Sequence, residues 1–248
     1  MRLTFSFIVP GGFASSLASF ASALASFYHT GLLLLSTCTF FQPQFAAHQT
    51  EPVNLSAVIS SLSQKYSRLT GLAADFTQIY IAPDGRSRRE SGRLLLKKTR
   101  KARWDYEAPE RKVFLSDGRN IYFYVYGDPE ATSVSIRESA DPQIPFLFLL
   151  GHSDLRKEFA RIELAPTEEP LIRGNLVLRL FPKRAPEEFK QILVEVSTAS
   201  LTVHRVVIVA PDNSRMDFHL ANVREGYVPP DSDFTFAPPP GVKIRRAN

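Results

Sequence analysis

The stretch that decides the fold, residues 92–106, reads Gly-Arg-Leu-Leu-Leu-Lys-Lys-Thr-Arg-Lys-Ala-Arg-Trp-Asp-Tyr. From residue 102 to residue 107, apolar and charged side chains alternate, and this period of two is typical of a strand with one buried face. Residues 94–96 are instead leucine at every position, and residues 121–126 are apolar or aromatic throughout. An antiparallel sheet with water on its outer face does not need such runs. We therefore expect either a partner or covering layer on the outer face, or burial at a sheet edge.

The same alternation recurs at regular intervals along the chain. We expect strands at residues 72–81, 102–107, 120–127, 133–137, 160–164, 175–181, 191–197, 202–210 and 215–223. Turn signals such as Asp84-Gly85 and Asp117-Gly118 separate these runs. Short strands at this spacing favour a mainly β chain built on one strongly curved antiparallel sheet rather than on parallel β-α-β units.

Two helical segments are expected beside the sheet. Between residues 52 and 69 the apolar side chains recur with a period near 3.6, which predicts an amphipathic helix. Asn54 is the expected N-cap of that helix and Gly71 its stop signal. The apolar segment 145–151, Pro-Phe-Leu-Phe-Leu-Leu-Gly, interrupts the strand pattern and is expected to form a short helix packed over the sheet.

Residues 1–47 have the character of an export leader. Arg2 is their only charged residue, and the apolar run 31–41 is too short to cross a bilayer as a helix. Cleavage after Ala47 would leave residues 48–248 as a single domain without cysteine, which would exclude disulfides, thiolate zinc sites and cysteine nucleophiles. In an alternative interpretation, Leu-Ser-Thr-Cys at 35–38 is a lipoprotein-processing box and Cys38 receives lipid.

The composition and motifs argue against an enzyme. With 44% hydrophobic and 22% charged residues, the chain is neither a disordered protein nor a multi-span membrane protein. It has no nucleotide-binding, serine-hydrolase or zinc-protease signature. His152, His204 and His219 lack metal-ligand spacing, and Asp117 is best interpreted as a turn residue. We expect no catalytic site, no metal and no cofactor.

The net charge of +5 includes three basic runs, at residues 86–89, 97–103 and 243–246. Nucleic acid is one partner that such runs attract, but export of the chain argues against it. Solvated strand ends are the default interpretation. Docking to an acidic partner surface or to anionic lipid is a third.

A set of motifs follows in a characteristic order along the chain. They are Asp-Phe-Thr-Gln at 75–78, the stretch 92–106 followed by Glu-Ala-Pro, Val-Phe-Leu-Ser-Asp-Gly at 113–118, the segment 145–151, and Phe-Thr-Phe-Ala-Pro-Pro-Pro-Gly-Val at 234–242. In this order and spacing they resemble the LolA family of periplasmic outer-membrane lipoprotein carriers. The resemblance implies an incomplete, strongly curved antiparallel β-barrel, with a helical lid over an apolar cavity.

The resemblance also implies a function. A family member accepts triacylated lipoproteins from an inner-membrane lipoprotein-releasing ABC transporter and passes them to an outer-membrane acceptor. Each acyl methylene kept from water is worth about 0.8 kcal/mol, so such cargo needs an apolar cavity. The lid must open at small cost, because the cargo has to leave. No exposed edge or heptad calls for association, so we expect a monomer.

The acyl chains are expected to contact apolar side chains of the matching motifs and strands. These candidate cavity residues are Phe76, Leu94, Leu96, Trp104, Phe123, Phe146, Leu147, Phe148, Leu149 and Leu150. Ordinary core packing is the alternative for each, since large apolar residues at period two are usually core.

One departure from the family pattern affects the lid. Family members often have Arg-Pro where this chain has Lys98-Thr99, and that arginine holds the closed lid through its backbone. Lys98 is therefore the candidate latch, although it lacks the planar fork of arginine; Arg100 or Arg103 are alternatives. Ala102 also replaces a position that is usually larger and apolar.

Two other functions fit the same fold. Lipidation of Cys38 would favour a membrane-anchored lipoprotein acceptor or a glycolipid carrier. A periplasmic regulator that senses mislocalised lipoproteins usually has an added C-terminal domain, whereas this sequence ends at Asn248.

Overall fold

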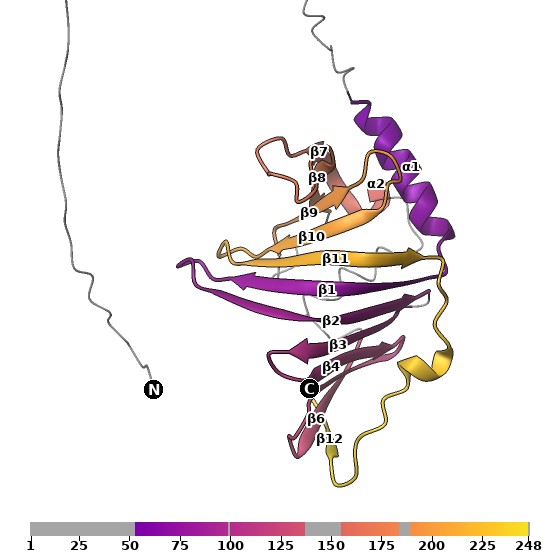
Figure 1. Ribbon diagram of the computed structural model, residues 1–248, viewed down its shortest axis with the longest axis vertical. Coiled ribbons are helices and arrows are strands. Elements are labelled where there is room, and N and C mark those ends of the chain that lie inside the picture. Colours follow the sequence, from indigo (N-terminus) through magenta and orange to yellow (C-terminus); the bar gives the residue numbers. More distant parts are fainter. Residues whose placement is uncertain (1–52, 99, 137–154, 184–188, 248) are drawn as a thin grey trace, which may run out of the picture. The chain divides into compact units, whose positions relative to one another are not determined.

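The computed structural model describes residues 53–98, 100–136, 155–183 and 189–247, and Figure 1 shows how they are arranged. The strands are β1 (Gly71–Ile81), β2 (Ser87–Lys97), β3 (Lys101–Ala108), β4 (Lys112–Asp117), β5 (Asn120–Val125), β6 (Glu130–Ser135), β7 (Phe159–Leu164), β8 (Leu176–Pro182), β9 (Gln191–Val196), β10 (Val203–Val209), β11 (Arg215–Glu225) and β12 (Lys243–Arg246). The helices are α1 (Leu55–Arg68), the single turn α2 (Leu155–Glu158) and the 3-10 helix η2 (Asp231–Phe234).

All twelve strands belong to one open sheet, in the order β12-β6-β5-β4-β3-β2-β1-β11-β10-β9-β8-β7. Every neighbouring pair is antiparallel except β12 and β6, which run parallel. The prediction of a mainly β chain on one curved antiparallel sheet is confirmed. The parallel edge strand β12 is an addition that the alternation does not predict, because it joins the sheet only after a long excursion of the chain from β11 (Figure 1).

The predicted amphipathic helix is also confirmed, with shorter bounds. The Asn54 Oδ1 atom accepts a hydrogen bond of 3.0 Å from the Ala57 backbone N–H, which makes Asn54 the N-cap. Ile59, Leu62 and Tyr66 lie on the buried side of α1. Asp117 is a turn residue as expected, since its Oδ1 accepts from two successive backbone N–H groups, those of Arg119 and Asn120, each at 2.7 Å.

Irregular positions let neighbouring strands approach closely. The register between β2 and β3 shifts at Ser91 and Gly92, as at a β-bulge. A Cβ atom at Gly92 would lie only 1.9 Å from the Asp105 backbone oxygen, so a side chain there would push β3 away. A bulge raises local twist, and glycine permits the close approach of the adjacent backbone.

The inner face of the sheet holds the main core. Side chains from β1–β5 and β8–β11 pack with those of α1 into one continuous apolar cluster, and its largest fully buried members include Trp104, Phe218 and Leu94. The alternation of period two places these side chains on one face.

The outer face is covered in two places by the chain itself. Residues 165–175 lie over β8–β10, where Ala165 packs with Val177, Leu193 and Val207. The segment 229–242, which we call the C-terminal strap, crosses β3–β5, and Phe236 in it stacks on the Tyr122 ring at 5.0 Å. The expected outer covering layer therefore exists over residues 121–126. It also explains why β4, which is buried on both faces, lacks the alternation used to predict strands.

Candidate functional site

A row of apolar side chains crosses the inner face of the sheet. The register pairs Leu94 of β2 with Trp104 of β3, Trp104 with Phe114 of β4, and Phe114 with Phe123 of β5. All four side chains therefore point to the same face. Leu94, Trp104 and Phe114 are buried, whereas Phe123 is 40% exposed. The row thus runs from the closed core to a solvent-accessible aromatic ring.

An aromatic cluster lies at the centre of this face. The Phe76 ring packs edge-on against Trp104 at 4.8 Å and against Tyr106 at 4.9 Å between ring centroids. The Phe218 ring lies 5.2 Å from Trp104. Edge-to-face pairs at these distances are favourable beyond the area that they bury. Of the ten candidate cavity residues, four belong to the main apolar core, which includes these rings: Phe76, Leu94, Leu96 and Trp104.

The other candidates are less enclosed or not placed. Phe123 lies on the same face of the sheet, at the exposed end of the row, and is not part of the core cluster that includes α1. Phe146, Leu147, Phe148, Leu149 and Leu150 lie outside the described residues, as does the whole predicted helix 145–151. The structure therefore brings four of the ten candidates together and places a fifth in line with them.

α1 covers the aromatic cluster with an apolar underside. Ile59 and Leu62 are each about 5% exposed and belong to the same core cluster as Phe76 and Trp104. The opposite side of the helix is polar and faces away from the sheet. This is the arrangement that the period of 3.6 predicts for a helix lying on a sheet.

Polar side chains fasten the C-terminal half of α1. The Tyr66 hydroxyl donates to Glu225 Oε1 at 2.8 Å and accepts from the Val203 backbone N–H at 2.9 Å. Lys65 Nζ lies 2.7 Å from Glu225 Oε2 and donates to the Ser200 backbone oxygen at 2.8 Å. Burial, reinforced by the charge of Glu225, raises the pKa of Tyr66 above its usual range, so the hydroxyl stays protonated.

Lys98, the candidate latch, also contacts this half of the helix. Its Nζ atom donates to the Ser67 backbone oxygen at 2.6 Å. Ser67 lies in the last turn of α1, where carbonyl groups lack partners within the helix and a cation is favourable. Lys98, which follows β2, thus contacts the helix that covers the inner face. Its role as a latch remains a prediction.

The N-terminal half of α1 is fastened by α2. Arg156 donates to Ser60 Oγ at 3.0 Å and to the Ser56 backbone oxygen at 3.0 Å, and Leu155 N–H donates to Ser63 Oγ at 3.2 Å. Sequence reasoning missed Arg156 and Glu225, because each is an ordinary surface charge until the fold brings it to α1. It placed Lys65 on the polar side of the helix but did not predict the partners of Lys65, which are Glu225 and Ser200. No local signal in the sequence marks such long-range pairs.

A polar group closes one end of the apolar face. The Tyr106 hydroxyl donates to Gln78 Oε1 at 2.6 Å, and Lys112 Nζ lies 2.6 Å from Glu90 Oε1 and 4.5 Å from the Tyr106 ring centroid. Gln78 and Glu90 are buried and directly opposed on β1 and β2. Gln78 is hydrogen-bonded to Tyr106 and Glu90 is paired with Lys112, so both buried polar side chains have partners. They mark where the apolar surface stops.

The chemistry available on this face is apolar binding. Phe76, Leu94, Leu96 and Trp104 offer large hydrophobic contacts, and the polar groups nearby are engaged with one another or with α1. Among the residues that the structure describes, no three His, Cys, Asp or Glu side chains are grouped so as to hold a metal ion. The helices in that part of the chain are all too short or too polar to span a bilayer.

Several known proteins resemble this chain in sequence. Residues 67–237 match the family model described as outer membrane lipoprotein carrier protein LolA. A protein of Methylococcus capsulatus named outer-membrane lipoprotein carrier protein is 32% identical over 174 residues, which span 70% of this chain and 80% of the relative. One of the same name from Salmonella paratyphi A is 28% identical over 190 residues, 75% of this chain and 86% of the relative.

Among solved structures, a LolA superfamily protein from Nitrosomonas europaea aligns with 75% of this chain and 99% of its own, at a TM-score of 0.41 and 10% identity. The assignment rests on the sequence matches, which include β1–β11 and every described candidate cavity residue. The chain belongs to the LolA family of outer-membrane lipoprotein carrier proteins.

Proposed function

We propose that this protein is a periplasmic carrier that binds the acyl chains of lipoproteins on the inner face of its sheet and delivers them to an outer-membrane acceptor. Its cargo would be triacylated lipoproteins released by an inner-membrane ABC transporter. One observation carries the proposal beyond family membership: a continuous apolar face is covered by a helix that is attached to the sheet through side chains.

The proposal assigns roles to the residues of this site. Phe76, Leu94, Leu96, Trp104 and Phe123 would contact the acyl chains, together with residues 146–150, and Lys98 would hold the closed state. Residues 48–248 would form the carrier domain after removal of the leader 1–47. With cargo bound, α1 would move off the aromatic cluster, because that cluster is fully enclosed in the closed state.

The energetics suit reversible binding. Moving α1 away exposes Ile59 and Leu62, at a cost of about 1.5–3 kcal/mol for each fully buried side chain. Each acyl methylene that takes their place recovers about 0.8 kcal/mol. Since the helix and the acyl chain bury the same surface in turn, the difference between the two states stays small. A carrier needs such a balance, because it must release its cargo to an acceptor.

A release assay with two matched variants tests the proposal. The purified protein is added to spheroplasts that make a labelled triacylated lipoprotein, with the host-matched transporter present, and the soluble fraction is examined for a complex. Phe123→Gln, on the inner face at 40% exposure, should reduce the complex several-fold. Tyr126 directly follows β5, is 43% exposed, and points to the outer face by alternation, so Tyr126→Gln should leave the amount of complex unchanged.

The possible outcomes separate the alternatives. A soluble complex that depends on Phe123 and not on Tyr126 supports the carrier and its inner-face site. Release that is equal for both variants would keep the carrier and reject the site. No release at all would overturn the soluble carrier and favour an anchored acceptor or a carrier of other lipids.

A further inference from the structure

The outer face of the sheet contains a groove that the carrier function does not use. It lies over β11, β1 and β2, and has a volume of about 590 Å³. Its described lining includes Ala73, Asp75, Arg93, Leu95, Asn222 and Arg224. The C-terminal strap covers β3–β5 and residues 165–175 cover β8–β10, so this groove is the strip between the two covers.

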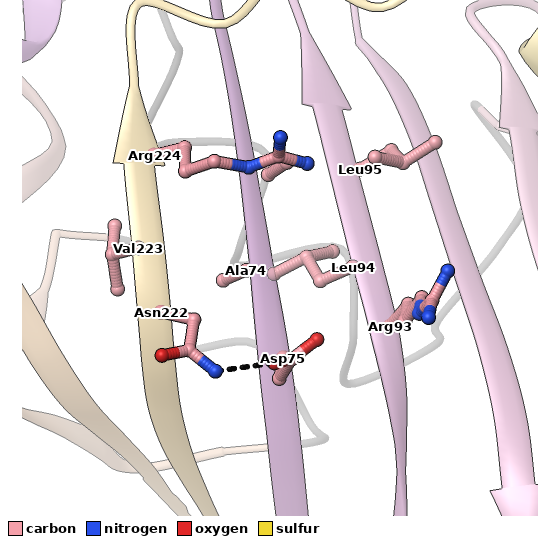
Figure 2. Close-up of a pocket in the computed structure, with 9 residues that line it drawn as sticks. Ala74, Asp75, Arg93, Leu94, Leu95, Asn222, Val223 and Arg224 are labelled. Atoms are coloured by element: carbon pink, nitrogen blue, oxygen red, sulfur yellow. Dashed lines mark hydrogen bonds between the residues drawn. The ribbon is translucent and has the colours of Figure 1, made fainter.

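The floor of the groove is apolar and its ends are cationic. Leu95 and Ala73 are paired across β2 and β1 and form the floor. Figure 2 shows Arg224 extending across β1 toward Leu95, with Arg93 separated from it on β2 and Asp75 on β1 between them. Of the three leucines at residues 94–96, Leu95 therefore faces outward. It lies in the groove, which neither of the two covers reaches.

The two arginines of the groove differ from Arg205 and Arg103, which also lie on the outer face. Arg205 makes two hydrogen bonds to the buried carboxylate of Asp217, at 2.8 and 2.5 Å, and Arg103 donates to Asp105 at 2.7 Å. Among the described residues, the ion pair of Arg93 is a 3.7 Å contact with Glu107 in which both side chains are more than 60% exposed, and Asp75 and Asp105 lie opposite Arg93 on β1 and β3. Such an exposed pair contributes little to stability.

Arg224 makes even less contact with acidic side chains than Arg93 does. Within the described part of the chain its guanidinium has no carboxylate at ion-pair distance, and it lies over the Tyr227 ring at 4.6 Å. The Asp75 carboxylate accepts a hydrogen bond of 2.7 Å from the Asn222 side chain instead. Arg224 therefore lies in line with the apolar floor of Ala73 and Leu95, and Arg93 lies two residues further along β2, beside Asp75.

The backbone under the groove is irregular in a way that fixes this geometry. The register between β1 and β11 shifts between Ala73 and Asp75, so β11 bulges at Asn222, which has a φ of 50°. Residues other than glycine are uncommon in this left-handed region of backbone conformation. The hydrogen bond to Asp75 holds Asn222 there, and bulges of this kind often re-aim a side chain beside a site.

We propose that the outer groove binds an extended acidic segment of a partner protein, in which two carboxylates engage Arg93 and Arg224 and an apolar side chain between them contacts Leu95. The register places the two arginines two strands and two residues apart, which corresponds to about 12 Å between their Cα atoms. In an extended peptide, side chains i and i+4 lie on one face about 13 Å apart.

The test uses three probe peptides and the full chain. The probe Ser-Glu-Ser-Val-Ser-Glu-Ser carries two carboxylates and a central valine on one face. In the first control peptide lysine replaces glutamate, and in the second serine replaces valine. Fluorescence anisotropy with labelled peptides should show binding of the first probe, weaker binding without valine and none with lysine. The affinity should fall as salt is raised.

Matched double variants localise the binding. Arg93→Glu with Arg224→Glu should weaken the glutamate probe by about tenfold or more. Arg89→Glu with Arg246→Glu makes the same change in net charge at exposed positions outside the groove, and should leave the affinity within about twofold. All four residues are exposed, so both variants should fold, which circular dichroism checks.

Several results would overturn the proposal. If the glutamate probe does not bind, or if both double variants weaken it equally, the groove is not a specific site for acidic segments. If phosphatidylglycerol vesicles displace the probe and bind only the protein with intact Arg93 and Arg224, the groove serves a lipid surface instead. The double variant at Arg93 and Arg224 should still form the soluble lipoprotein complex, so the release assay tests the two proposals separately.

Discussion

The two faces of the sheet are both covered, but the covers are attached in different ways. On the inner face, α1 lies on the core through Ile59 and Leu62 and is fastened by side chains such as Tyr66 and Lys98. On the outer face, the C-terminal strap buries Phe234 and then joins the sheet edge as β12, whose backbone pairs with β6.

The difference lies in the backbone. A helix satisfies most of its own backbone hydrogen bonds, so moving α1 away from the sheet leaves few backbone groups unpaired, among them the Ser67 carbonyl and the Val203 N–H. The strap has no such independence, because the chain continues from it directly into β12, a strand whose hydrogen bonds depend on β6. The inner cover is therefore suited to opening, and the outer cover to permanent attachment.

The largest expected effect is on the inner core itself. Trp104→Ala should lower the free energy of unfolding by about 3–5 kcal/mol, because it removes a fully buried ring from the aromatic cluster. Phe236→Ala, which removes a half-buried ring from the strap, should cost clearly less. Urea denaturation measures both, and a larger loss for Phe236→Ala would reverse the comparison.

A smaller effect is expected where α1 is fastened. Tyr66→Phe keeps the ring but leaves the buried Val203 N–H without its acceptor, at a cost of about 1–2 kcal/mol. Hydrogen exchange of the α1 amides should accelerate more than exchange in β3. Tyr122→Phe is the control, since its hydroxyl makes a long contact of 3.4 Å with Asp117, on the face opposite α1, and its loss should change α1 exchange little. Equal acceleration of α1 and β3 exchange would mean that α1 does not open separately.

The smallest effect concerns the strap and depends on pH. Hydrogen bonds from Lys97 and Lys101 lower the pKa of Asp231 to about 2, whereas an unfolded aspartate titrates near pH 3.9. Because the folded pKa is the lower one, the contribution of Asp231 is fully present above about pH 4 and is lost as the pH falls through about 2. The melting temperature of the wild type should exceed that of Asp231→Asn slightly at pH 7, and the difference should vanish near pH 2. A difference that grows on acidification would contradict this assignment.

The sequence determined the elements that have a local signal. Asn54 and the apolar period of 3.6 predicted α1, and the alternation around Trp104 predicted β3 and its buried face. The ordered motifs also led to the correct family. These predictions succeed because side-chain direction along a helix or strand follows directly from residue spacing.

Only the tertiary structure decided what the two faces do. It brought Glu225 to Tyr66 and Phe236 to Tyr122, and it left Arg93 and Arg224 beside an apolar floor. Each of these pairs joins strands or segments far apart in the sequence, and the spacing of residues along the chain contains no record of which distant segment will lie opposite. That depends on strand order, bulges and the path of the strap, which are settled by packing of the whole sheet.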